Sequence, residues 1–352
     1  MSLKFFSYLL YISFITVSAQ NFYVEIAPWQ GAKPGAVSIS FDDASFTQYE
    51  YAYPILKKYD LPATFSLVGE WTRQKASNSA EPGMFQIKKM GWKQIRKLSD
   101  EQYEIAAHGY RHVRYGKYLP VDTLINQMKR IKLLIENQIN QPVYTLHYPY
   151  SFTSDSIVKA TRKSGFIFGR TGGNDYNSYQ NFNPYLLKTK AVLNDTLPNI
   201  DSFKKILKLT KGKWLILMYH HLFPETSKEM KIMNYHNVLH TYSLYPKTFD
   251  RQMKLVKESG YHIDTEANIG RYMIERIHTK LSYKKICKKL IIKTKTDLDK
   301  KVYKVPLSLI VKLPWQKVKL KGSLHDGTFE VQKGQILIDI LPGNTVKIKK
   351  MK

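Results

Sequence analysis

Cysteine is nearly absent from this sequence: Cys287 is the single thiol in 352 residues. An intrachain disulfide is therefore excluded, and the chain must be held together by its hydrophobic core. A hydrophobic content of 43% over this length is enough for one large core, or for a large domain together with a small one. Internal repeats and low-complexity tracts are also lacking, which excludes repeat and fibrous architectures.

Acidic residues are scarce as well, with 28 Asp and Glu against 55 Lys and Arg, a formal net charge of +27. A surface of this sign favours anionic partners, namely nucleic acid, an anionic membrane or an acidic polysaccharide. The sequence contains no recognisable nucleic-acid-binding motif, so a nucleic-acid partner is not expected.

The N-terminal segment has the pattern of a secretory signal peptide over residues 1–19. Lys4 precedes an apolar run from Phe5 to Val17, and Ser18 and Ala19 complete a small-residue cleavage site. The run is too short for a comfortable membrane span. We expect a secreted, periplasmic or cell-surface protein without a stable membrane span after cleavage.

Residues 35–280 alternate between short apolar runs and helical patterns. This alternation predicts a parallel α/β sheet, either open or closed into a barrel. The expected strands are Ala36–Phe41, Ala63–Val68, Tyr103–Ala107, Val143–His147, Phe166–Arg170, Leu186–Val192, Trp214–Tyr219 and Tyr261–Asp264. The expected helices are Tyr49–Tyr59, Trp92–Leu98, Asp122–Ile139, Ser156–Lys163, Ser202–Leu209, Pro246–Glu258 and Ile269–Ile277, with Asp122 as the cap of its helix.

Near residue 283 the sequence pattern changes to short runs of alternating apolar and polar residues, separated by turn residues. Such a pattern predicts a small all-β, sandwich-like domain over 283–352, after a larger domain over 20–282. The expected strands are Ile291–Ile292, Val302–Val305, Leu307–Leu313, Val318–Leu320, Thr328–Val331, Ile336–Leu341 and Val346–Ile348. From Leu281 onward the chain has 18 Lys against 5 acidic residues, a net of +13. Either a solvated basic face or a surface that binds an anionic polymer explains this excess.

Polar side chains follow several of the expected strands at the point where each strand ends. In parallel α/β folds the carboxyl ends of the strands converge on one face, which carries the site. The residues concerned are Asp42 and Asp43, then His108 and His112, then His147 to Tyr150, then Arg170, and finally His220 and His221.

Two adjacent carboxylates at the end of a buried strand either begin a turn and cap the next helix, or hold a cation. His108 and His112 are spaced so that two imidazoles can meet one ion if the loop turns helically. Together with an aspartate they would form a two-His, one-Asp site with open positions, which is a catalytic rather than a closed structural arrangement.

These motifs resemble those of the polysaccharide deacetylases of the NodB-homology type, carbohydrate esterase family 4. Ser40-Phe41-Asp42-Asp43 is similar to the first motif of that family, and His108 to His112 to its second, His-Ser/Thr-x-x-His. His147-Tyr148-Pro149-Tyr150 is similar to the third motif, Arg-x-Pro-Tyr, and Leu217-Met218-Tyr219-His220 to the last. The resemblance covers residues 35–265 and implies a distorted (β/α)7 barrel.

The resemblance also implies roles for individual residues. Asp43, His108 and His112 would bind a divalent metal ion, usually zinc. Asp42 would be the general base, and His220 the general acid that protonates the leaving amine. The backbone N–H of Tyr150 would stabilise the oxyanion. We place His147, Tyr148, Tyr150 and Arg170 among the substrate-binding residues.

The sequence departs from the family pattern at several positions. His147 stands where the third motif has an arginine that orients the base, and a buried histidine bonded to a carbonyl would explain it equally well. Gly109 replaces a Ser or Thr, Ala44 replaces a Gly, and His221 stands where an Asp is common. The fourth motif, an Asp–Trp pair, has no clean match.

The leading hypothesis is a secreted, metal-dependent deacetylase of an acetylated polysaccharide, with N-acetyl groups of amino sugars as the expected target. O-deacetylation and an anionic substrate remain open. The alternatives are a non-catalytic carbohydrate-binding protein on a degenerate deacetylase scaffold, motivated by the altered motifs, and a charge-driven anion-binding protein.

Overall fold

The computed structural model describes residues 22–72, 77–78, 87–114, 119–194, 199–227 and 241–352. The expected signal peptide at 1–19 lies outside the described residues. Among the described helices, none combines the length and the apolar character that a membrane crossing requires.

Seven parallel strands close into a barrel, so the expected (β/α)7 barrel is confirmed. Their order is β2, β3, β6, β7, β8, β9 and β10, and β10 pairs with β2 to complete the circle. The eighth strand, β13, pairs beside β2 in parallel through His262 and Ala36. The bounds are β2 Ala36–Phe41, β3 Thr64–Leu67, β6 Glu104–Ala107, β7 Thr145–His147, β8 Phe168–Gly173, β9 Leu187–Ala191, β10 Trp214–Tyr219 and β13 His262–Ile263.

The residues of β2 show why this strand is central. All six are buried, but they alternate between two environments. Val37, Ile39 and Phe41 pack in the large core between the strands and the outer helices. Ser38 and Ser40 alternate with them and lie on the other side, toward the barrel interior. The interior is therefore polar near the end of β2, where Asp42 follows.

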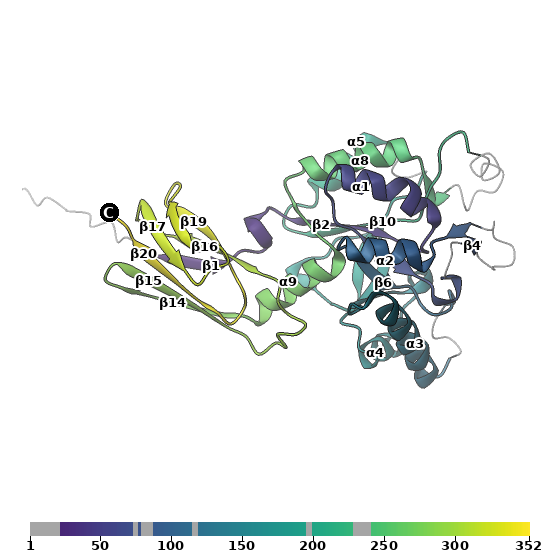
Figure 1. Ribbon diagram of the computed structural model, residues 1–352, viewed down its shortest axis with the longest axis horizontal. Coiled ribbons are helices and arrows are strands. Elements are labelled where there is room, and N and C mark those ends of the chain that lie inside the picture. The colour runs from purple at the N-terminus through teal and green to yellow at the C-terminus, as the bar shows by residue number, and fades with distance from the viewer. Residues whose placement is uncertain (1–21, 73–76, 79–86, 115–118, 195–198, 228–240) are drawn as a thin grey trace, which may run out of the picture.

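Helices surround the barrel, and Figure 1 shows α1, α5 and α8 on one side with α3 and α4 on another. The expected helices are all present with ends shifted by up to three residues. Their bounds are α1 Tyr53–Lys58, α2 Trp92–Asp100, α3 Val121–Ile139, α4 Asp155–Lys163, α5 Ile200–Lys208, α8 Pro246–Glu258 and α9 Glu266–His278, with a π-helical turn Gln48–Ala52 before α1.

The expected cap of α3 is wrong. The helix is preceded by Pro120, which has no side-chain cap, and Asp122 lies inside the first turn. There its negative charge is favourable beside the positive end of the helix dipole.

The C-terminal residues form a β-sandwich, so the expected all-β domain is observed. A five-stranded sheet in the order β14, β15, β20, β17, β18 packs on a three-stranded sheet in the order β1, β16, β19. The bounds are β1 Tyr23–Ile26, β14 Lys280–Ile286, β15 Lys289–Lys295, β16 Leu307–Lys312, β17 Lys317–Lys321, β18 Gly327–Glu330, β19 Gln335–Ile340 and β20 Thr345–Lys350. Short strand pairs are also present, namely β4 Ser77–Asn78 with β5 Lys88–Lys89, and β11 His221–Leu222 with β12 Ser243–Leu244.

Three features of the sandwich differ from the sequence expectation. Strand β1, placed with the larger domain by its position in the chain, pairs antiparallel with β16 through Tyr23 and Lys312. The expected strand Val302–Val305 is not a strand, because the backbone N–H of Val305 donates to the carboxylate of Glu275 instead of to a neighbouring strand. The expected boundary at 283 falls inside β14.

Helix α9 joins the two parts of the molecule, and Figure 1 shows it between the barrel and the sandwich. Its first residue, Glu266, is fully buried in the barrel. Tyr272 belongs to the core of the sandwich, and its hydroxyl donates to the carbonyl of Ala27 at 2.9 Å. The helix approaches β8 so closely that a Cβ on Gly270 would lie 2.6 Å from the ring of Phe168.

Candidate metal and catalytic site

The carboxyl ends of the barrel strands line one cavity of about 380 Å³. Asp42 and Asp43 come from the end of β2, His108 and His112 from the loop after β6, and His220 from the end of β10. Tyr148 and Tyr150, from the segment after β7, line the same cavity. The expected convergence of these residues on one face is therefore observed.

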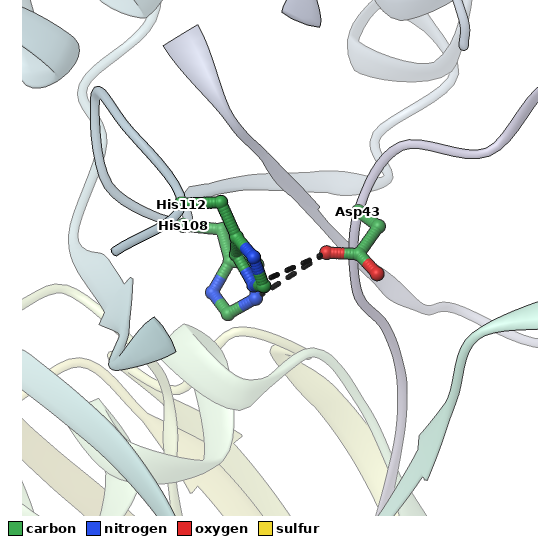
Figure 2. Close-up of side chains that lie close together, drawn as sticks. All are labelled: Asp43, His108 and His112. Atoms are coloured by element: carbon green, nitrogen blue, oxygen red, sulfur yellow. Dashed lines mark ion pairs between the residues drawn. The ribbon is translucent and has the colours of Figure 1, made fainter. Parts of the chain in front are cut away.

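Asp43, His108 and His112 form a group that can hold a metal ion (Figure 2). The Oδ1 atom of Asp43 lies 3.5 Å from Nε2 of His108 and 3.7 Å from Nε2 of His112. Both separations are too long for a good hydrogen bond. Ligand atoms about 2.1 Å from an ion lie about 3.4 Å apart along a tetrahedral edge, which these separations approach. The donor set therefore fits a divalent ion.

The state of the carboxylate of Asp43 supports this fit. Its Oδ1 atom is buried and has no hydrogen-bond partner among the described residues. Burial opposes ionisation, but Lys89 and the surrounding histidines lower the pKa of Asp43 below its usual range. A buried, ionised oxygen without a partner is costly, and coordination of a cation would remove that cost.

His108 is oriented by a hydrogen bond on the far side of its ring. Its Nδ1 atom lies 3.0 Å from the backbone carbonyl oxygen of His147, which assigns the proton to Nδ1 and leaves Nε2 facing Asp43. Burial lowers the pKa of His108 to about 4, so the imidazole is neutral near pH 7, as a metal ligand must be.

The backbone around the group is held in left-handed conformations. Asp43 has φ 74°, Ala44 has φ 48° and Gly109 has φ 83°. The left-handed region favours glycine, and Gly109 adopts it without strain. Strain of this kind at Asp43 and Ala44 is typical of functional sites.

Asp42 is buried beside the candidate metal-binding residues, and three side chains hold its carboxylate. Its Oδ1 atom accepts hydrogen bonds from Ser66 and His147, each at 3.0 Å. Nη2 of Arg170 lies 2.5 Å from both carboxylate oxygens. Burial would raise the pKa of Asp42, but the guanidinium of Arg170, together with His108 and His147, holds it well below its usual range. The Oδ2 atom lies 3.9 Å from Nε2 of His108, next to the candidate ion position.

Arg170 and His147 lie behind Asp42 rather than on the cavity wall. We expected both to contact substrate, but Arg170 is 2% exposed, His147 is fully buried, and neither lines the cavity. Arg170 reaches Asp42 from β8, although the family motif supplies its arginine from the position that His147 occupies here. In the structure, Arg170 makes the contact with Asp42 that the resemblance led us to expect of that arginine.

His147 lies between two carboxylates. Its Nδ1 atom contacts Asp42, and its Nε2 atom lies 3.1 Å from the carboxylate of Glu266. Burial and Arg170 lower the pKa of His147, but the two carboxylates outweigh them and raise it above its usual value. Glu266 also lies 3.9 Å from Nε of Arg170. Asp42 is thus anchored through His147 and Arg170 to the first residue of α9.

Glu266 was not predicted from the sequence. The only signal was its position after Thr265, whose side chain caps α9, and an acidic residue there is common in any helix. Lys89 was missed as well. It is 4% exposed in β5, and its Nζ atom lies 4.1 Å from the centre of the Trp71 ring.

His220 and His221 follow β10 on the cavity wall. Burial lowers the pKa of both rings, to about 3 for His221. Nδ1 of His220 is buried and has no hydrogen-bond partner among the described residues. The His220 ring lies 4.7 Å from that of Tyr242. His220 therefore reaches the cavity, as expected of the residue proposed as the acid.

The two tyrosines of the third motif differ in their surroundings. Tyr148 is 1% exposed, and its hydroxyl donates to the carbonyl of Tyr185 at 3.1 Å. Tyr150 is 53% exposed at the cavity rim, with its ring 4.5 Å from that of His112. Its backbone has φ 57°, a left-handed conformation that is unusual for tyrosine. Of the two, Tyr150 is the one whose ring is exposed at the rim, where it also contacts His112 and Arg114.

Comparisons with known proteins agree with this geometry. Residues 30–169 match the family model described as polysaccharide deacetylase. The chain is 27% identical over 144 residues to the putative polysaccharide deacetylase YxkH of Bacillus subtilis, covering 40% of this chain and 47% of that protein. It is 28% identical over 140 residues to the poly-beta-1,6-N-acetyl-D-glucosamine N-deacetylase of Staphylococcus aureus strain N315, covering 38% of this chain and 47% of that protein. The matches thus span about half the length of each relative.

Solved structures are similar at lower identity. The deacetylase PplD of Streptococcus pyogenes in complex with acetate is 22% identical with a TM-score of 0.40, over 49% of this chain and 68% of that chain. A CE4 family pseudoenzyme from Bacillus anthracis is 18% identical with a TM-score of 0.44, over 67% of this chain and 66% of that chain.

Proposed function

From the premise that residues 30–169 belong to the polysaccharide deacetylase family, we propose that this protein removes N-acetyl groups from amino sugars of a polysaccharide. The observation that carries the proposal is the pairing of two aspartates with different surroundings. Asp43 has a buried oxygen that faces two imidazoles and finds no hydrogen-bond partner within the described parts of the chain. Its neighbour Asp42 is anchored by Arg170 and His147.

Asp43, His108 and His112 are the residues that would hold a divalent ion, and the two imidazoles make zinc the preferred candidate. When bound, such an ion supplies Lewis-acid polarisation of the acetyl carbonyl and lowers the pKa of water.

Asp42 is placed to act as the general base. Its carboxylate is ionised at neutral pH because the Arg170 guanidinium holds its pKa low. Oδ1 accepts hydrogen bonds from Ser66 and His147, whereas Oδ2 lies on the side of the metal group. If Oδ2 took a proton from water, the attraction of Asp42 to Arg170 and His147 would become weaker. These two residues therefore lower the basicity of Asp42, but they also fix the orientation of its carboxylate.

His220 is placed to act as the general acid. It comes from β10, which pairs with β2 directly, so that its ring and Asp42 line the same cavity from neighbouring strands. A protonated His220 would donate a proton to the leaving amine as the carbon–nitrogen bond breaks. The backbone N–H of Tyr150 would donate to the oxyanion that forms on the acetyl carbonyl.

The test is acetate release from oligomers of N-acetylglucosamine, measured with zinc added and with a chelator. We expect release by the zinc-treated protein, and loss of at least about 100-fold in kcat for Asp42→Asn. Asp100→Asn, an exposed residue of α2, is the matched control and should retain full activity. A panel that includes O-acetylated glycans separates amide from ester hydrolysis. If the zinc-treated protein binds the glycans but releases no acetate from any of them, the non-catalytic alternative is correct.

We also propose that residues 1–19 direct export of the protein and are removed. The Val17-Ser18-Ala19 sequence supports this proposal. N-terminal sequencing of the mature protein should begin at Gln20, and an intact Met1 in the exported protein would contradict the proposal.

A further inference from the structure

The outward face of the five-stranded sheet carries lysines on its three central strands. Buried and exposed residues alternate along β15, β20 and β17, so that one set of side chains fills the sandwich core and the other faces outward. We call six of these outward lysines the lysine face: Lys289 and Lys293 of β15, Lys347 and Lys349 of β20, and Lys319 and Lys321 of β17. Lys295 and Lys317, at the strand ends, also face outward, and Lys317 pairs with Glu330 of β18 at 3.0 Å.

The register places five of these six lysines directly opposite one another, and Lys293 lies opposite Thr345. Lys349 lies between Lys289 on one side and Lys319 on the other, and Lys347 lies opposite Lys321. Like charges in directly opposed positions destabilise a sheet. The outward positions of the three strands hold no acidic residue that would offset this repulsion.

Protection of a sheet edge does not explain this arrangement. Proteins place lysines on edge strands to prevent pairing with other chains. Here the edges of the sheet are β14 and β18, and the opposed lysines lie on the strands between them. The repulsion is therefore concentrated where no edge needs protection, and an anionic ligand would relieve it.

The composition of the face favours one class of polyanion. Single-stranded nucleic acid is bound on aromatic side chains, and membrane surfaces are bound through inserted aromatic and large aliphatic residues. The outward positions of the three central strands contain lysine, threonine and one isoleucine, Ile291, but no aromatic residue and no arginine. An acidic polysaccharide needs only charges and hydroxyl contacts.

A hollow of about 250 Å³ adjoins the lysine face at the β14 edge. It is lined by Ser282, Tyr283, Lys284, Ile291 and Lys293. The two ammonium groups, the hydroxyl of Ser282 and one aliphatic side chain suit a sugar ring that bears a carboxylate or a similar anionic group, whereas the hydroxyl of Tyr283 donates to the carbonyl of Phe22.

We propose that the lysine face binds an acidic polysaccharide. The bound polysaccharide would thereby be kept on the same chain that carries the proposed deacetylase site. The choice of a polysaccharide, among polyanions, rests on the proposed function. The binding itself does not require catalysis, so the two can be tested separately.

The experiment measures the affinity of the full chain for polygalacturonate at low and at moderate salt. The variant Lys319→Gln, Lys347→Gln, Lys349→Gln removes three charges from the lysine face. The control variant Lys93→Gln, Lys129→Gln, Lys159→Gln removes the same charge from exposed positions on α2, α3 and α4. We expect the lysine-face variant to bind about tenfold more weakly than the control variant at low salt, with a smaller dependence on salt.

The same measurement with double-stranded DNA and with phosphatidylglycerol vesicles identifies the class of partner. Equal affinities of the two variants for polygalacturonate would overturn the proposal, and so would tighter binding of the unchanged protein to DNA or to vesicles. Melting temperatures show whether the variants fold, and we expect the lysine-face variant to melt no lower than the control variant. Acetate release from neutral N-acetylglucosamine oligomers should be the same for both variants, which separates this proposal from the proposed function.

Discussion

Arg170 places one guanidinium nitrogen 2.5 Å from both carboxylate oxygens of Asp42. The two residues are 128 positions apart and come from non-adjacent strands, β2 and β8. This contact fixes the orientation of the carboxylate next to the candidate metal group. It also compensates for the histidine that stands where the family motif has an arginine.

Arg170→Lys should therefore impair catalysis more than binding. Lysine keeps the positive charge but cannot reach both oxygens in the planar geometry of a guanidinium. We expect kcat for acetate release to fall about 100-fold with little change in KM, because a small misplacement of a catalytic group has an effect of this size. A variant with unchanged kcat would show that Arg170 does not position Asp42.

Glu266→Gln tests the contacts of Glu266 with His147 and Arg170, the two residues that hold Asp42. The substitution removes one of the two buried carboxylates that Arg170 and His147 contact, and breaking a buried ion pair in this way costs about 3–5 kcal/mol. We expect a lower free energy of unfolding in denaturant titrations, together with a reduced kcat.

Glu104→Gln is the matched control for that variant. Glu104 is half-buried in the barrel, where it accepts hydrogen bonds from Thr64, Thr145 and the backbone N–H of Ala267. These contacts are not ion pairs, so the loss of stability should be smaller than for Glu266→Gln. Equal losses would mean that the charge of Glu266 is not what stabilises the site.

Gly270→Ala tests how closely α9 must approach the barrel. The added methyl group would lie 2.6 Å from the ring of Phe168, and overpacking of this kind costs about 1–3 kcal/mol. Gly212→Ala is a useful comparison, because its methyl group meets open space and only its left-handed backbone, φ 76°, is penalised. Chemical denaturation should show Gly270→Ala to be destabilised, and a stability equal to that of the unchanged protein would show that α9 can shift away from β8.

Stability should also depend on pH through Glu275. Burial raises the pKa of this carboxyl group to about 7, above its ordinary value of 4.5, and the group accepts a hydrogen bond from the backbone N–H of Val305. Between pH 4.5 and about 7 the folded protein retains a proton that the unfolded chain has lost. The contribution of Glu275 to stability is therefore present at low pH and is lost as the pH rises through this window.

Glu275→Gln should remove that dependence, because glutamine resembles the protonated acid. We expect the variant to be more stable than the unchanged protein above pH 7, and the difference to disappear near pH 4.5. Melting curves across this range are the measurement. Parallel pH profiles for the two proteins would contradict the assignment.

The barrel and the position of its site could be predicted from the sequence because they depend on local patterns. Ala36–Phe41 and Trp214–Tyr219 are buried runs whose ends match the observed strands, and residues after parallel strands necessarily meet at one edge. This rule predicted Asp42, Asp43, His108, His112 and His220, which line the cavity. It did not predict Arg114, Ser151 or Tyr242, which line it as well.

The supporting contacts could not be predicted, because they depend on residues distant in the chain. Glu266 lies 119 positions from His147, and nothing near it in the sequence marks it as a partner of that ring. Strand β1 was not predicted for the same reason, since its four residues pair with a strand that begins at Leu307. Arg170 was recognised as a site residue, but the sequence could not show that its side chain points to Asp42.

The most direct test of this account is the zinc stoichiometry of the protein, measured by titration calorimetry on the metal-stripped chain. We predict one zinc ion per chain, no change in stoichiometry for Asp42→Asn, and affinity reduced at least about 100-fold for Asp43→Ala, since only Asp43 is a ligand. Failure of the unchanged protein to bind zinc or another divalent ion, or equal affinities for the two variants, would contradict it.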